Sequence, residues 1–317
     1  MSKVLTTEKL IASVRRRAMI PDDTSTFTDD DIIDIMNEEL VEQVLSDVMV
    51  TNEEHLVYSQ DEDTVADNTR YKIPYRAVGN KLRDIAYLDS SDQQYEMSRI
   101  SLEELSDYSA SYTQNGRDVF WVQGADINVL AIRLNDYAKL RYYYYMNPSS
   151  LVKADKIGVI AGIDRSTGVI TLSNFPVDFA NEPVMDFVGN RAPSSIKCID
   201  KKPTSVSSSV KTVTFAIADI PADLIVGDYL CKREESPVPN LPSEFHPIVA
   251  QVTAIFILES MGDTEGLSNA NAKLVKMKES IIQITSDRVE GSPQKVNPRH
   301  TPLVQTSSYG SRRKGRL

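Results

Sequence analysis

Residues 27–49 read FTDDDIIDIMNEELVEQVLSDVM, and this stretch decides the first half of the fold. Thr28 stands three residues before Asp31, which is the spacing of a helix N-cap, and acidic residues fill the first turn, where the helix dipole favours negative charge. The stretch predicts an amphipathic helix. Its apolar stripe consists of Ile32, Ile33, Ile35, Met36, Leu40, Val41, Val44, Leu45, Val48 and Met49.

A shorter helix is predicted before this one. Within residues 6–18 an apolar face forms at helical spacing, and Pro21 closes the segment. The members of that face are Leu10, Ile11, Val14 and Ala18.

The C-terminal part is predicted to be helical as well. One helix should start near Pro247, with Ser243 as its cap, and should stop at Gly262. In residues 265–287 apolar side chains then recur at steps of three and four, at Leu267, Ala270, Leu274, Met277, Ile281 and Ile284. This heptad seam predicts packing along a partner helix, either the preceding helix or one on another subunit.

Between the helical ends the hydrophobic period shifts towards two, which predicts strands. The expected strands are 70–73, 82–88, 95–100, 119–122, 127–132, 140–146, 157–163, 169–172, 211–217 and 228–231. Tyr142 to Tyr145 suit a strand covered on both faces. Residues 61–63 are expected in a solvated loop and residues 205–209 in a connector, and the three prolines of residues 237–242 predict a linker.

The pattern as a whole indicates an α+β protein. The N- and C-terminal helices are expected to form one bundle, with a large, mainly antiparallel β insertion between them and an extended basic arm at the end. The predicted parts are the N-terminal helices (1–55), a first β region (56–150), a second β insertion (151–235), the C-terminal helices (236–290) and the arm (291–317).

The charge is distributed unevenly along the chain. The 317 residues carry a formal charge of −10, with 41% hydrophobic and 25% charged residues, which excludes wholesale disorder. The last 30 residues alone carry +6, so the other 287 carry −16. A basic end on an acidic body is typical of an interaction arm. Scattered apolar residues within it, such as Leu303 and Tyr309, could anchor a docking strand.

No motif of a catalytic or ligand site is present. The sequence lacks a phosphate-binding loop with its Lys-Ser/Thr pair, a G-x-S-x-G pattern and an H-E-x-x-H pattern. The three histidines are far apart, His246 is expected to be structural, and the two cysteines fit a reducing cytoplasm and lack the close pair of a zinc site. We expect no enzyme, metal or cofactor, and neither a signal peptide nor a membrane helix.

The order of these elements resembles the head-to-tail adaptor proteins of tailed bacteriophages, of the podovirus-like kind. The resemblance rests on RRRAMIP (15–21), FTDDDIIDIMNEELVEQV (27–44), IPADLIVGDYL (220–230) and NLPSEFHPIVAQVTAIFILESMGD (240–263). It covers the helical two-fifths of the chain, and residues 151–235 exceed what the simplest adaptors require.

The resemblance implies a structural virion protein of the neck, assembled in the host cytoplasm. Twelve copies would form a ring that binds the portal protein and a tail or further neck protein, while genomic DNA passes through the lumen without specific binding. The portal would be bound by the arm, through Arg288, Lys295, Arg299, Leu303, Tyr309, Arg312, Arg313, Lys314 and Arg316. Subunit or bundle packing would use Leu267, Leu274, Met277, Ile281 and Ile284.

Three alternatives remain at this stage. The chain could be another tail or fibre-docking protein, or a DNA-binding protein that uses its basic tail, although the −16 body opposes the second. A glycan hydrolase with a carboxylate pair drawn from Asp164, Asp178 and Asp186 is the third, and sequence spacing alone does not establish the geometry that it needs.

Overall fold

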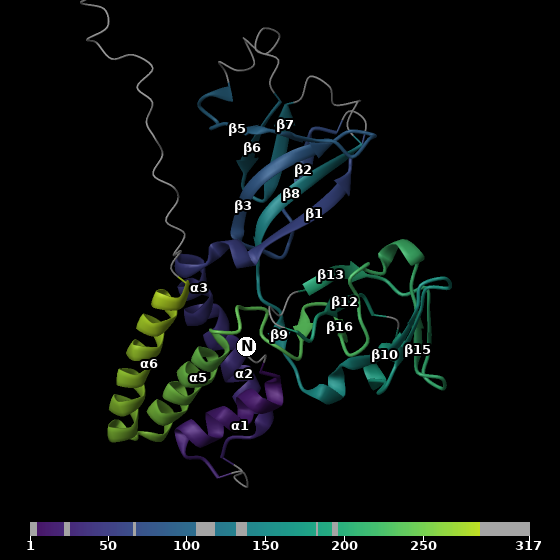
Figure 1. The fold of residues 1–317 in the computed structure, drawn as a ribbon. Helices are drawn as coiled ribbons and strands as arrows, with labels where there is room; N and C mark the ends of the chain where they lie inside the picture. The colour runs from purple at the N-terminus through teal and green to yellow at the C-terminus, as the bar shows by residue number, and fades with distance from the viewer. Residues whose placement is uncertain are drawn as a thin grey trace, which may run out of the picture. The chain divides into compact units, whose positions relative to one another are not determined.

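The computed structural model describes residues 5–21, 26–65, 68–105, 118–130, 138–181, 183–191 and 196–285. It confirms the α+β class, with helices from both ends of the chain and mainly antiparallel sheets between them (Figure 1). Contacts divide the chain into a unit of Met1–Ile284 and a unit of Thr285–Leu317. The predicted arm, residues 291–317, lies outside the described residues.

The helix predicted over residues 28–49 is present but not regular. It consists of α2 (Asp29–Glu39), a π-helical turn η1 (Leu40–Val44) and α3 (Leu45–Thr51). Its start is a capping box: the Asp31 N–H donates to Thr28 Oγ1 at 3.2 Å, and the Thr28 N–H donates to Asp31 Oδ2 at 2.8 Å. The N-cap predicted at Thr28 is therefore confirmed.

These helices pack with three others into one bundle. α1 (Thr7–Ala18) lies along α5 (His246–Met261), and α6 (Thr264–Thr285) follows α5 after a left-handed turn at Gly262, as Figure 1 shows. One hydrophobic core joins all of them, with fully buried members such as Leu10, Ile32, Met36, Ile248 and Val252. Residues more than 200 positions apart in the chain thus share a single core.

The first β region contains two four-stranded sheets. β1 (Val57–Asp63), β8 (Lys139–Met146), β3 (Ala77–Leu88) and β4 (Gln94–Glu96) form one, in that order. β2 (Arg70–Lys72), β7 (Asp126–Leu130), β6 (Val119–Gln123) and β5 (Ser98–Arg99) form the other. Along β8 burial alternates, so Tyr142 and Tyr144 are buried while Tyr143 and Tyr145 are half-buried, and the expectation of two covered faces was only half right.

The second β region is a seven-stranded sheet. Its order is β13 (Ile196–Lys201), β12 (Met185–Val188), β16 (Tyr229–Lys232), β10 (Gly158–Asp164), β11 (Val169–Leu172), β15 (Thr212–Thr214) and β14 (Ser205–Ser207). The short strands β9 (Ser150–Leu151) and β17 (Glu235–Ser236) pair separately, in parallel. The β10–β11 hairpin ends at Gly168, with φ +76°, and a Cβ there would lie 2.2 Å from the Phe215 carbonyl oxygen.

Four local predictions were wrong. Residues 61–63 are not a loop, because they end β1, and the connector predicted at 205–209 contains β14. The proline-rich linker is buried rather than exposed, since residues 236–243 have little contact with solvent. Ser243 does not cap α5: its hydroxyl bonds the neighbouring Glu244 carboxylate, and the N-cap position is Phe245.

Replacing the capping hydroxyl at Thr28 should weaken the bundle. We expect Thr28→Ala to lower the free energy of unfolding by about 1 kcal/mol, because the Asp31 N–H loses its acceptor. Thr28→Ser keeps the hydroxyl and serves as the matched control. Chemical denaturation of the three proteins measures the effect, and equal midpoints for all three would contradict the role given to this cap.

Candidate assembly site

The residues predicted to contact the portal all lie outside the described residues. They are Arg288, Lys295, Arg299, Leu303, Tyr309, Arg312, Arg313, Lys314 and Arg316. Their role in binding a partner stays a prediction. The other predicted set, on the last helix, is fully described.

Most of the α6 seam faces its own bundle. Ile281 is buried, and Leu274 and Met277 pack half-buried against the bundle core. Gln251 on α5 fixes this packing, since its Nε2 donates to the Ala270 carbonyl at 3.0 Å and its Oε1 accepts from Arg17 on α1. Leu267 is also half-buried, whereas Ile284 is 63% exposed. The preceding helix and α1 therefore provide the partner surface for the middle of the seam.

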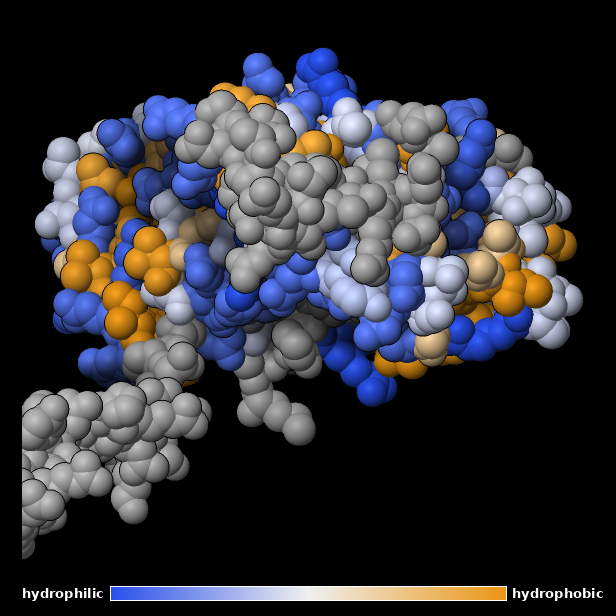
Figure 2. All heavy atoms as spheres, turned by 90° about the horizontal axis from the view of Figure 1, so that it is seen from above, coloured by the Kyte–Doolittle hydropathy of each residue, from blue (hydrophilic) through white to orange (hydrophobic). Residues whose placement is uncertain are grey.

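A second face of α6 is apolar and exposed, and the heptad pattern did not reveal it. Val275 and Ile282, one heptad apart, are 56% and 53% exposed. Lys278 lies between them and forms an ion pair of 2.8 Å with Asp47 on α3, a helix on which Val50 is also exposed. Figure 2 shows exposed hydrophobic residues on the left of the view, the side on which Figure 1 shows α6, and others on the right. Exposed apolar side chains gathered on one face are typical of an interaction surface.

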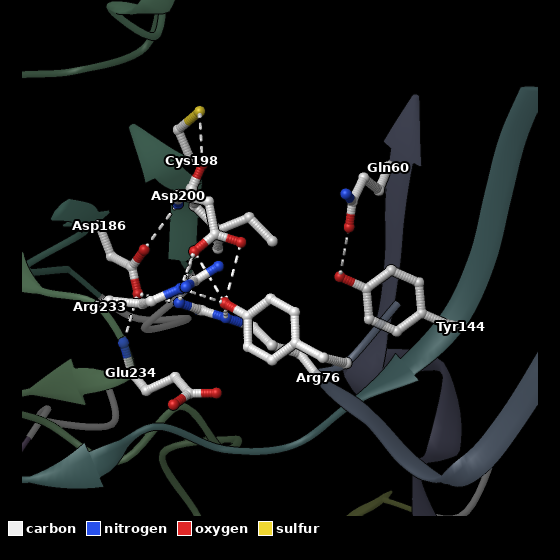
Figure 3. Close-up of polar contacts among 10 residues, drawn as sticks. Gln60, Arg76, Tyr144, Asp186, Cys198, Asp200, Arg233 and Glu234 are labelled. Atoms are coloured by element: carbon white, nitrogen blue, oxygen red, sulfur yellow. Dashed lines mark hydrogen bonds and ion pairs between the residues drawn. The ribbon is translucent and has the colours of Figure 1, made fainter. Parts of the chain in front are cut away.

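The two β regions are held together by a buried ion pair (Figure 3). Arg76, in the turn before β3, is 3% exposed, and its Nη2 lies 2.8 Å from Oδ2 of the fully buried Asp186 on β12. Asp186 also accepts hydrogen bonds from the backbone N–H groups of Asp200, at 2.9 Å, and Glu234, at 3.0 Å. The carboxylate thus has three donors, which is how a buried charge is accommodated.

Tyr75 extends this cluster towards the surface. Its hydroxyl accepts from Arg76 Nε at 2.7 Å and donates to the Asp200 carboxylate at 2.8 Å. Arg233 lies over the Tyr75 ring, 4.4 Å from its centroid, and its Nε donates to Asp200 at 2.8 Å. Residues from β3's turn, β12, β13 and the β16–β17 turn meet in one network.

Burial and ion pairing have opposite effects on the pKa values of Asp186 and Arg76. Burial raises the pKa of Asp186, against the lowering effect of Arg76 and of its backbone donors. Burial alone would lower the pKa of Arg76, but Asp186 and the Tyr75 hydroxyl raise it above its ordinary value. Arg76 therefore stays charged, and it supplies the positive charge that Asp186 needs in the interior.

The three carboxylates considered for a hydrolase have separate partners. Asp164 accepts from the Ser166 N–H and hydroxyl inside the β10–β11 turn, and these bonds lower its pKa to about 2. Asp178 forms an ion pair with Lys232 at 3.1 Å, and Asp186 is held by Arg76. Within the described ranges, no group of three His, Cys, Asp or Glu side chains is placed to hold a metal ion.

His246 is structural, as expected. It is fully buried at the start of α5, where its Nδ1 accepts from the Leu5 N–H at 3.2 Å and its Nε2 lies 3.2 Å from the Leu241 carbonyl oxygen. With these two partners Nδ1 is the acceptor and Nε2 carries the proton, so the ring is neutral. It connects the beginning of the described chain to the buried proline-rich segment.

The chain matches no protein-family model and no curated protein. Within the described residues no helix combines the length and the apolar character that crossing a bilayer demands.

Removing Arg76 should destabilise the protein strongly. Arg76→Ala leaves the Asp186 charge buried without its partner, a change that typically costs about 3–5 kcal/mol. Arg141→Ala is the control, because it breaks the partly exposed pair with Asp61 and should cost less than about 1 kcal/mol. Chemical denaturation measures the free energy of unfolding of both variants. Equal losses of stability would show that the buried pair contributes no more than the partly exposed one.

His246 should make stability depend on pH. Burial lowers the pKa of His246 below its ordinary 6.5, so the unfolded chain binds a proton at a pH where the folded protein does not. Stability should therefore fall as the pH drops below that value. We expect the melting temperature to fall less on acidification in His246→Gln than in the unaltered protein, and an identical pH dependence in both would contradict this role.

Proposed function

We propose that this protein is a head-to-tail adaptor of a tailed bacteriophage, a structural virion protein without enzymatic activity or cofactor. Copies of it would form a ring in the neck, bind the portal protein and extend the DNA channel towards the tail. The observation that carries the proposal is the exposed apolar face of α6, at Val275 and Ile282, on a bundle built from both ends of the chain.

This face suits a contact between copies. Its apolar side chains flank Lys278, which is already paired with Asp47, and the exposed Glu279, so a neighbour that covers the face would place a basic group opposite Glu279. A contact between this face and a different surface of the next copy would be heterologous, and repeated heterologous contacts form a ring when the rotation between copies closes.

The uneven charge supports the same role. The first 287 residues carry −16, and a lumen lined by acidic residues would repel DNA phosphates and let the genome pass without specific binding. The last 30 residues carry +6 and would contact an acidic surface on the portal. Twelve such contacts around a ring would bind far more tightly than one, because each later contact forms at a high effective concentration.

Electron microscopy of the purified protein with its portal tests the proposal. We expect rings on the portal for the unaltered chain and for Ser280→Glu, which changes an exposed polar site on α6. Ile282→Glu places a charge in the apolar face and should prevent ring formation while leaving the melting temperature within a few degrees of the unaltered value. The absence of rings with the unaltered chain would overturn the proposal.

The arm is tested separately. Deleting residues 291–317 should abolish attachment to the portal but leave the circular-dichroism spectrum and melting temperature unchanged. Portal binding at the unaltered level by the shortened chain would remove the arm from the mechanism. If the unaltered chain binds DNA and not the portal, with an affinity that falls steeply as the salt concentration rises, a DNA-binding protein would be favoured instead.

A further inference from the structure

A groove of about 360 Å³ lies between two sheet edges. It is lined by residues 58–61 of β1, residues 198–201 of β13, and Arg141. β1 is the end strand of its four-stranded sheet, and β13 is the end strand of the seven-stranded sheet. In Figure 3 Gln60 stands on one side and Cys198 and Asp200 on the other. Two strand edges without a further neighbour among the described strands therefore border the same groove.

Only the edge of β1 is regular enough to accept another strand. β1 pairs with β8 in unbroken register from Val57 to Asp63. The pairing of β13 is interrupted by register shifts, and Asp200 within it has a positive φ of 57°. An extended segment can add to a straight edge through main-chain hydrogen bonds, whereas a bulged edge offers donors and acceptors at the wrong spacing.

The chain itself contains a segment that matches this edge. Between Pro302 and Gly310 stand seven residues, LVQTSSY, without proline or glycine and with Val, Thr and Tyr among them. β1 is also seven residues long. The segment would thus pair along the whole strand. Pro302 and Gly310, which bound it, both disfavour strand pairing.

The charges around the two partners are complementary. Exposed acidic residues stand at both ends of β1, with Glu53 before it and Glu62 and Asp63 at its end, whereas Glu54 and Asp61 are already paired with Arg83 and Arg141. Basic residues stand at both ends of the seven-residue segment, Arg299 before it and Arg312 to Lys314 after it. Acidic residues normally keep an edge strand from pairing with other chains. A strand that carries the opposite charge at each end is the kind of partner that this edge admits.

We infer that residues 303–309 of a second copy of this chain add to the edge of β1 and extend its sheet to five strands. The stretch from Thr285 to Leu303 spans up to about 60 Å when extended, which is enough to reach a neighbouring subunit. The inference rests on the proposed function and adds to it a contact between copies, and Arg288 and Lys295 remain available to the portal.

Disulfide crosslinking in the full-length chain tests this contact. Ser59→Cys places a thiol on the third residue of β1. Pairing along the whole strand puts Gln305 opposite it in a parallel arrangement and Ser307 opposite it in an antiparallel one, so Gln305→Cys, Thr306→Cys or Ser307→Cys is combined with it in three separate double variants. Residues directly opposite on paired strands have Cβ atoms about 4.5–5.5 Å apart, close to disulfide range. After mild oxidation we expect covalent dimers and larger species on a non-reducing gel for at least one variant, with the bond mapped by mass spectrometry to position 59.

Two controls separate pairing from chance encounter. Ser59→Cys alone, and Ser59→Cys with Ser292→Cys, should give at most a tenth of the covalent dimer. Adding Thr306→Pro to the best variant at position 305 or 307 removes a backbone donor and should reduce crosslinking at least tenfold, whereas Thr306→Ala should not. If position 306 crosslinks best, Val304→Pro and Val304→Ala take their place.

Several results would overturn the inference. These are no crosslink at any of the three positions, a crosslink confined to single chains, equal yields in the controls, and insensitivity to proline. Rings on the portal in a protein that gives no such crosslink would leave the proposed function standing and remove this contact. Copies that crosslink but never bind a portal would support this contact and overturn the proposed function.

Discussion

The structure depends on one constraint: the helical core forms only when helices from the N-terminal and C-terminal parts of the described chain meet. The Thr7 N–H and hydroxyl both donate to the Pro237 carbonyl, at 2.8 Å and 3.0 Å, and the Leu5 N–H donates to His246. The buried segment 236–243 has few N–H donors of its own, because proline has no N–H. Donors from α1 therefore form part of the hydrogen bonds that its buried carbonyl groups need. The β regions must leave the bundle and come back to it.

The connection between the two β regions is fixed to the same bundle. Asn37 on α2 accepts from the Leu151 N–H at 2.7 Å and donates to the Leu151 carbonyl at 3.2 Å, so its side chain pairs with that backbone like a strand neighbour. Together with the Arg76–Asp186 pair, this connects both β regions and the helices to each other through polar contacts. Such contacts have strict geometry and make the packing of these parts specific.

Features that depend on residues close together in the sequence were predicted correctly. The N-cap at Thr28, the stop at Gly262 and the strands predicted at 157–163 and 169–172 depend on residues within a few positions of each other, and the structure contains all of them, the two strands as β10 and β11. β1 was missed because it ends in Asp61, Glu62 and Asp63, which have low strand propensity and are tolerated there because that end of the strand is exposed.

The remaining features depend on contacts between distant residues. β12 carries a charged residue in four buried positions, and Arg76, 110 residues earlier, supplies the opposite charge that Asp186 needs there. The proline-rich segment resembles a linker because no neighbouring residue in the sequence indicates that α1 packs on it. For the same reason the heptad pattern of α6 predicted the side that packs on the bundle and not the exposed Val275 and Ile282.

The joining of residues so far apart also has a consequence for synthesis. α1 and α2 leave the ribosome more than 200 residues before α5, which supplies the centre of their core. At about 5–20 residues per second, the N-terminal helices wait roughly 10–50 s with their apolar faces uncovered. A nascent chain in that state is a natural client for a chaperone, and its folding should be slow, because the contacts that complete it are the most distant ones.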